Sequence, residues 1–187
     1  MKKFEEKTIT SNTIFTGRVI SLKVDEVQLP NGKTSNREII NHPGAVAVIA
    51  ITDEGKLLVV EQYRKAIERS IIEIPAGKLE PGEAPAVTAR RELAEETGYG
   101  CEELTYIQTF VTSPGFADEV IHLYAARRLF VLEEQAQLDE DEFVELMAVT
   151  IEEAEAMVAD KRIFDAKTAF AVLWMKMQHL SNSPQRN

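Results

Sequence analysis

The chain has little of what a disulfide-rich, membrane-embedded or nucleic-acid-binding protein needs. Its 187 residues include one cysteine, Cys101, so no disulfide can form within the chain, and a reducing compartment such as the cytoplasm is expected. No apolar run approaches the roughly 18 residues that cross a bilayer, and no apolar segment follows the early lysines as it would in a signal peptide. A formal charge of −10 disfavours broad nucleic-acid binding.

Nitrogen and sulfur ligands for a metal are also scarce. The three histidines are scattered along the chain and fit no metal-binding spacing. Carboxylates are abundant instead, and three of them crowd into five positions: Glu92, Glu95 and Glu96. Like charges this close repel one another, so a bound cation is the simplest explanation for the cluster. Carboxylate oxygens favour Mg²⁺ or Mn²⁺, which would bridge to a phosphorylated substrate.

The spacing of the cluster predicts a helix that gathers these side chains. Glu92 and Glu96 are one turn apart and Glu95 is three residues from Glu92, so their carboxylates can converge. Arg91 flanks them and is placed to orient a neighbouring carboxylate. We expect the helix to begin near Pro85 and to end at Gly98. The alternative is a solvated, charged helix face without a ligand.

The residues around the cluster carry a longer pattern. Gly77 is followed after five residues by Glu83, and after seven more by the run RELAEETGY at 91–99. This segment resembles the complete signature of the Nudix hydrolases. The resemblance implies that Glu92 and Glu96 bind Mg²⁺ directly, that the backbone carbonyl of Ala76 completes the site, and that Glu95 is a further or water-mediated ligand.

The rest of the chain predicts an α/β fold with a mixed sheet and helices on both faces. Strands are expected within 6–28 and at 34–40, 45–51, 57–63, 71–74, 105–112, 119–127 and 142–150, and helices at 151–160 and 165–180. In the second of these helices, a stripe of Ala169, Val172, Leu173 and Met177 is read as core packing or a dimer contact. The resemblance implies a Nudix α/β/α sandwich over 42–180, preceded by a β extension at 1–41 and followed by a flexible tail at 181–187.

A second stretch of sequence indicates which branch of the family the chain resembles. Residues 112–119 read TSPGFADE, and Pro114 lies sixteen residues after Gly98. A proline at that offset is similar to the bacillus-type ADP-ribose pyrophosphatases, although Pro-Gly marks a loop turn in any protein. In that branch a similar N-terminal extension is exchanged across a homodimer, so a homodimer is expected.

The resemblance also implies roles for the remaining candidates. Glu140 is expected as general base and Glu142 as metal ligand, in an acidic loop over the metals, with the reverse order or a loop without a role as alternatives. Arg64 at a strand end is a candidate to bind phosphate or ribose oxygens, Glu119 to accept from ribose hydroxyls, and Arg18 to stack on adenine. Arg37 in the extension could reach the substrate site of the partner subunit if the dimer exchanges that extension. Each arginine could equally be a surface residue.

The chain is therefore expected to be a Mg²⁺-dependent enzyme that hydrolyses ADP-ribose to AMP and ribose 5-phosphate. Two alternatives remain. Another nucleoside diphosphate sugar or a dinucleotide could be the substrate, or the chain could be a module that senses ADP-ribose without cleaving it.

Overall fold

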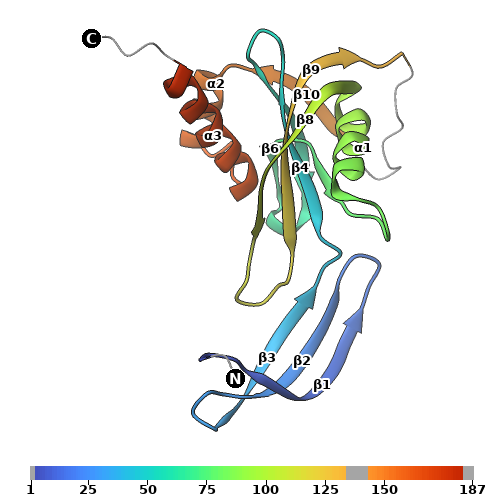
Figure 1. Ribbon diagram of the computed structural model, residues 1–187, viewed down its shortest axis with the longest axis vertical. Coiled ribbons are helices and arrows are strands. Elements are labelled where there is room, and N and C mark those ends of the chain that lie inside the picture. The colour runs from blue at the N-terminus through green and yellow to red at the C-terminus, as the bar shows by residue number, and fades with distance from the viewer. Residues whose placement is uncertain (1–2, 134–142, 183–187) are drawn as a thin grey trace. The chain divides into compact units, whose positions relative to one another are not determined.

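The computed structural model describes residues 3–133 and 143–182 (Figure 1). The backbone divides into two compact units. The N-terminal unit comprises residues Met1–Ala45 together with Thr109–Ile121, and the α/β unit comprises Val46–Gln108 together with His122–Asn187. No helix in the described ranges is both long and apolar enough to cross a membrane.

The N-terminal unit is built on a three-stranded antiparallel sheet in the order β1-β2-β3, with β1 at Lys7–Thr16, β2 at Ser21–Gln28 and β3 at Thr34–Asn41. A turn at 30–32 joins β2 to β3, and Gly32 has the positive φ of 84° that such a turn favours. All ten residues of the edge strand β1 are exposed. The segment before β9 joins this unit through a bridge between Ile40 and Ala117.

The α/β unit is organised around a seven-stranded sheet. Its main path runs β10-β5-β4-β9-β8, with β6 paired to β5 and β7 paired to β4. The strands are β4 Ala45–Ile51, β5 Leu57–Arg64, β6 Arg69–Glu73, β7 Ala76–Lys78, β8 Tyr99–Val111, β9 Val120–Val131 and β10 Val144–Val149, and a short 3₁₀ turn, η1, spans Lys65–Ile67.

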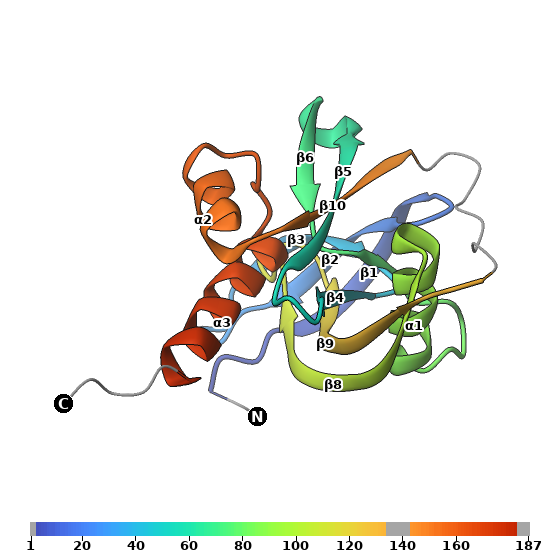
Figure 2. The same cartoon turned by 90° about the horizontal axis from the view of Figure 1, so that it is seen from above.

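Helices cover both faces of this sheet. Helix α1 (Pro85–Thr97) lies on one side, and α2 (Ile151–Ala159) and α3 (Ala166–Asn182) lie on the other (Figures 1 and 2). Helix α2 begins with a capping box, because Thr150 accepts from the Glu153 backbone and Glu153 accepts from the Thr150 backbone. The predicted mixed sheet between helices is confirmed.

The core lies between the central strands and the helices. Every residue of β4 is buried, as its continuous apolar sequence predicts. Leu93 of α1 packs into a cluster with Val48 and Leu58 of the sheet and with Cys101 at the start of β8. Burial raises the pKa of the Cys101 thiol, so this residue acts as a small apolar filler.

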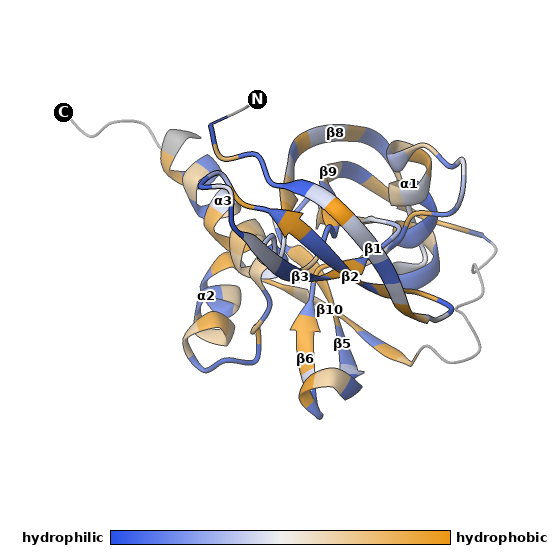
Figure 3. Cartoon of the chain, turned by 90° about the horizontal axis from the view of Figure 1, so that it is seen from below, coloured by the Kyte–Doolittle hydropathy of each residue, from blue (hydrophilic) through white to orange (hydrophobic). Residues whose placement is uncertain are grey.

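Some details differ from the sequence prediction. Strand β8 begins at Tyr99 rather than at 105, and the three-residue strand β7 was not among the expected strands, because a run of Ala, Gly and Lys has little strand propensity. The stripe on α3 is only partly buried: Val172 is 3% exposed, whereas Leu173 and Met177 are 61% and 65% exposed. Helix α3 carries hydrophobic residues along most of its length (Figure 3), so periodicity alone did not define the buried face.

Candidate active site

Helix α1 places the predicted carboxylates on one side, as their spacing in the sequence requires. Pro85 occupies the first turn, where its missing N–H costs nothing, and Gly98 ends the helix with a φ of 72° and a hydrogen bond to Ala94. Both ends are therefore where the sequence placed them. Leu93 faces the core and is fully buried, which fixes the rotation of the helix. That rotation brings the carboxylate side of α1 against β7.

Two of the three carboxylates are buried in this contact. Glu92 is 7% exposed and Glu96 is 6% exposed. The backbone N–H of Ala76 donates to Oε2 of Glu96 at 3.0 Å. Gly77 lies so close that a Cβ on it would be 1.9 Å from Cδ of Glu92. Only glycine allows the β7 backbone to approach a carboxylate this closely, which explains the glycine of the predicted pattern.

Arg91 supplies the positive charge that these buried anions need. Its Nη1 donates to Glu92 at 2.8 Å and to Glu95 at 2.7 Å, and its Nη2 reaches Glu83 at 3.3 Å. Burial disfavours the charge on Arg91, but the hydrogen bond to Glu83 and the charges of Glu92 and Glu95 outweigh it and raise the pKa of Arg91. The predicted orienting role of Arg91 thus has a geometric basis.

Glu83, from the loop before α1, closes the network on its outer side. It accepts from Arg91 and, at 2.8 Å, from the hydroxyl of the buried Thr88. These two bonds, the Arg91 bond first, lower the pKa of Glu83 and keep it ionised. The ion pairs therefore tie the loop 79–84 to the first turns of the helix.

A second charged network lies where β5 ends. Arg64 is the last residue of β5, as expected, and its Nε donates to Glu73 at 2.6 Å. Glu73 is 3% exposed and also accepts from Lys167 of α3. Burial opposes the charge of Arg64, but Glu73 and, more weakly, Glu96 raise its pKa. The printed hydrogen bond of Arg64 goes to Glu73, so this residue belongs to the Glu73 network.

The N-terminal unit holds the other described candidates. Arg18 is exposed between β1 and β2, and Arg37 on β3 forms a two-pronged pair with Glu6 at 2.6 and 2.8 Å. Pro114 lies in an exposed turn. Glu119 accepts from Thr112 at 2.5 Å and lies 3.8 Å from His42. Arg37 and Glu119 are thus already engaged in pairs that a substrate would have to share or displace.

Glu140 and Glu142 lie outside the described residues. Sequence reasoning missed Glu73 and Lys167 as members of a charged network. An acid inside the apolar run SIIEIP was a signal for Glu73, because a buried carboxylate needs a partner. No feature of the sequence indicated Lys167, which lies 94 residues after Glu73 in the chain.

The donor set of α1 fits a hard divalent cation, since its oxygens come from carboxylates on one helix face. Over residues 3–133 and 143–182, however, no three acidic, cysteine or histidine side chains converge in a metal-ligand arrangement. Arg91 holds Glu92 and Glu95 as ion pairs instead. A bound cation would have to share these carboxylates with Arg91.

Comparisons with known proteins agree with this geometry. Residues 41–170 match the NUDIX domain family, and residues 6–40 match the nucleoside diphosphate sugar hydrolase N-terminal domain family. The chain is 61% identical over 177 residues to the methanol dehydrogenase activator of Bacillus methanolicus, covering 95% of this chain and 96% of that one. It is 58% identical over 178 residues to the ADP-ribose pyrophosphatase of Bacillus subtilis (strain 168), with the same coverage.

A solved structure supports the fold independently. The crystal structure of an ADP compounds hydrolase superposes with a TM-score of 0.83, covering 99% of this chain and all of that one, at 20% identity. The family predicted from the segment 77–99 is therefore confirmed by the match over 41–170. The chain belongs to the Nudix family and is a pyrophosphohydrolase.

Proposed function

We propose that the chain hydrolyses ADP-ribose to AMP and ribose 5-phosphate with the help of Mg²⁺ or Mn²⁺. The observation that carries this proposal is the pair of buried carboxylates, Glu92 and Glu96, held against β7. The ADP-ribose pyrophosphatase at 58% identity supports the choice of substrate.

Glu92 and Glu96 are the proposed direct metal ligands, with the carbonyl of Ala76 and with Glu95 as a further or water-mediated ligand. A divalent cation bound there would neutralise the pyrophosphate and lower the pKa of the attacking water. Hydrogen bonds hold both side chains in place for this role: Glu96 accepts from the backbone of Ala76, and Glu92 accepts from Arg91.

The cationic side chains hold the surrounding geometry. Arg91 restrains Glu92 and Glu95 through one nitrogen, which keeps both carboxylates on the same side of the helix. Arg64 is the proposed contact to substrate phosphate or ribose oxygens. Glu73 accepts from its Nε, and the guanidinium has further N–H donors for substrate oxygens.

The general base is proposed to be Glu140, with Glu142 as an additional metal ligand. Both are assigned from the family resemblance, because they lie outside the described residues. Glu140→Ala and Glu142→Ala should each reduce kcat by orders of magnitude. Losses of only a few-fold in both variants would contradict the assignment.

The remaining substrate contacts are proposed on the N-terminal unit. Arg18 would stack on the adenine, and Arg37 and Glu119 would bind phosphate and ribose hydroxyls, with Pro114 shaping the loop beside them. Arg37 would exchange its present partner Glu6 for a substrate oxygen. Single alanine variants of these residues should raise KM and leave kcat unchanged.

We also propose a cytoplasmic homodimer that exchanges its N-terminal extension. Strand β1 is an exposed sheet edge that carries the large apolar residues Ile9, Ile14 and Phe15 at 51–55% exposure. A free edge with apolar side chains is a ready template for a second chain. Sedimentation should give a dimer, and deletion of residues 1–41 should abolish it.

The decisive experiment for the substrate is a panel of nucleoside diphosphate compounds incubated with Mg²⁺, with AMP release measured by chromatography. ADP-ribose should have the highest kcat/KM. A strong preference for a guanosine or uridine sugar would refute the substrate but retain the enzyme class. Tight binding of ADP-ribose without any turnover would instead indicate a sensing module.

A second function is favoured by the methanol dehydrogenase activator at 61% identity. We infer that the chain activates a methanol dehydrogenase. The test is a dehydrogenase assay with and without the chain, using the wild type and Glu96→Gln. Activation by the wild type alone would make hydrolysis the basis of activation, and no activation by either protein would refute this role.

A further inference from the structure

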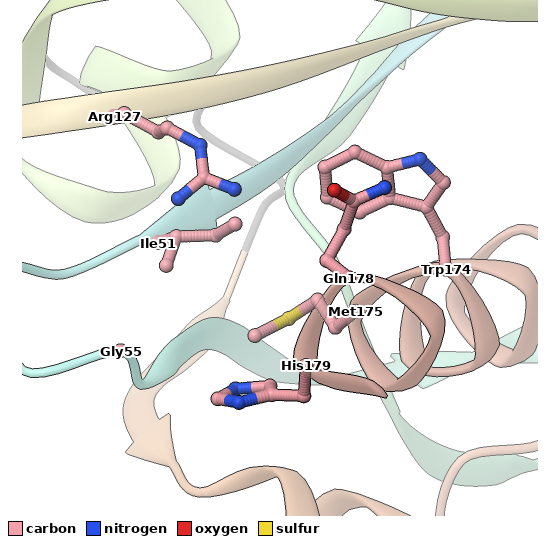
Figure 4. Close-up of a pocket in the computed structure, with 7 residues that line it drawn as sticks. All are labelled: Ile51, Gly55, Arg127, Trp174, Met175, Gln178 and His179. Atoms are coloured by element: carbon pink, nitrogen blue, oxygen red, sulfur yellow. The ribbon is translucent and has the colours of Figure 1, made fainter. Parts of the chain in front are cut away.

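A small cavity opens between α3 and strands of the sheet (Figure 4). Helix α3 lies on the face of the sheet opposite α1 (Figure 2). Its volume is about 130 Å³. Since a water molecule takes up roughly 30 Å³ in the liquid, the cavity can hold a phosphate group with a short organic portion. All the residues that line it belong to the α/β unit.

The floor of the cavity is apolar and its rim is polar. Ile51 of β4 and Met175 of α3 line its inner side, and both are at least 94% buried. Trp174, Gln178 and His179 line the helix side. Trp174 and Gln178 are four residues apart, and so are Met175 and His179, so α3 directs all of these side chains to one face.

Arg127 of β9 faces this rim from the sheet (Figure 4). In the described part of the α/β unit, every other arginine makes a hydrogen bond or an ion pair: Arg64, Arg69, Arg90, Arg91, Arg128 and Arg162. Arg127 makes none. Its guanidinium therefore has its donors available on the cavity side.

The cavity also has an unusual charge for this chain. Acidic residues outnumber Lys and Arg by 31 to 21 over the whole sequence, yet no carboxylate lines the described cavity. An unpaired guanidinium, an amide and an imidazole converge there instead. A planar guanidinium fork matches the oxygens of phosphate and binds them through charge-assisted hydrogen bonds.

We propose that this cavity binds a small phosphate compound through Arg127, with Gln178 and His179 as additional polar contacts and the Trp174 ring against its organic portion. The site is separate from the α1 carboxylates and does not depend on the proposed substrate. Inorganic phosphate and a sugar phosphate share the required chemistry. The more tightly bound of the two identifies the class of natural ligand.

The chain contains its own reporter for this test, because Trp174 is its single tryptophan. Fluorescence of the full chain is titrated with inorganic phosphate and with ribose 5-phosphate, in EDTA and at constant ionic strength, with chloride and acetate as controls. The chemical shift of the indole N–H is followed in parallel. We expect a saturable change with a dissociation constant of about 1 mM or below.

Arg127→Ala should weaken this binding about tenfold or more, because it removes the charge-assisted bonds. Arg128→Ala is the matched control. It removes the same charge from the adjacent residue, but Arg128 pairs with Glu102 at 2.7 Å rather than lining the cavity. Gln178→Ala should weaken binding less than Arg127→Ala, and circular dichroism checks that each variant is folded.

Three results would overturn the proposal. The first is no saturable change in either fluorescence or indole shift for both phosphate compounds. The second is equal binding by wild type and Arg127→Ala. The third is an equal response to chloride at the same ionic strength, which would show only general charge screening.

Discussion

Gly77 provides the sharpest test of the site, because its missing side chain lets β7 contact Glu92. In Gly77→Ala the new Cβ would stand 1.9 Å from Cδ and 2.0 Å from Oε1 of Glu92. No packing tolerates such distances, so either the carboxylate or the strand must move. The end of a Glu side chain is flexible, but this one is 7% exposed and is held by Arg91 at 2.8 Å.

The size of the effect follows from that constraint. Overpacking of this kind costs about 1–3 kcal/mol, which lowers Tm by roughly 2–12 °C in a chain of this length. The effect on turnover should be larger in relative terms, because a displacement of about 1 Å in a positioned group can cost on the order of 100-fold in rate. We therefore expect a folded protein with a moderately lower Tm and a kcat reduced about 100-fold.

The assay pairs thermal unfolding with hydrolysis of ADP-ribose, and a second variant isolates the contact. In Gly77→Ala/Glu92→Ala the atoms that collide are gone, so Tm should recover relative to Gly77→Ala while activity stays lost. Gly115→Ala is the control for stability, since a Cβ there has no neighbour within 4 Å. A normal kcat in Gly77→Ala, or no recovery of Tm in the double variant, would refute the close contact.

Three further predictions concern charged groups. Glu96→Gln should reduce turnover by orders of magnitude without lowering Tm, because the amide keeps the shape while relieving carboxylate repulsion, and near-normal activity would show that the metal site is elsewhere. Glu73→Ala should lower the free energy of unfolding, measured with urea, by about 3 kcal/mol, because it leaves the 10%-exposed Lys167 without its main counter-charge. A change below about 1 kcal/mol would contradict this. Asn41 lowers the pKa of Asp118 below its ordinary 3.8, so the stability that Asp118 adds is complete above that value and is lost as pH falls through the lower folded pKa. Asp118→Asn should remove that acid-dependent part from a profile of Tm against pH, and identical profiles would contradict the assignment.

The sequence predicted those parts of the fold whose signals are local. Pro85 and Gly98 bound α1 because the reasons for a helix to start and stop lie in the residues themselves. The apolar run at 45–51 is a fully buried strand for the same reason. The spacing of Glu92 and Glu96 correctly placed both carboxylates on one face of α1.

Contacts between distant segments could not be predicted in this way. The spacing of the carboxylates predicted that they gather on one face of α1, but Glu92 and Glu96 are buried because β7 covers them. The pairing of Glu73 with Lys167 spans 94 residues and left no mark in the sequence around the lysine. Periodicity could not separate core packing from a dimer contact along α3, where Val172 is buried and Leu173 is exposed.

Arg91 also affects the stability of the protein when no divalent cation is bound. Its guanidinium acts as a built-in counter-ion for Glu92 and Glu95. The chain can therefore fold and persist without any divalent cation, and a chelator should stop turnover while leaving the unfolding curve in place. The supply of divalent cation could then change the rate of turnover without changing the amount of folded protein.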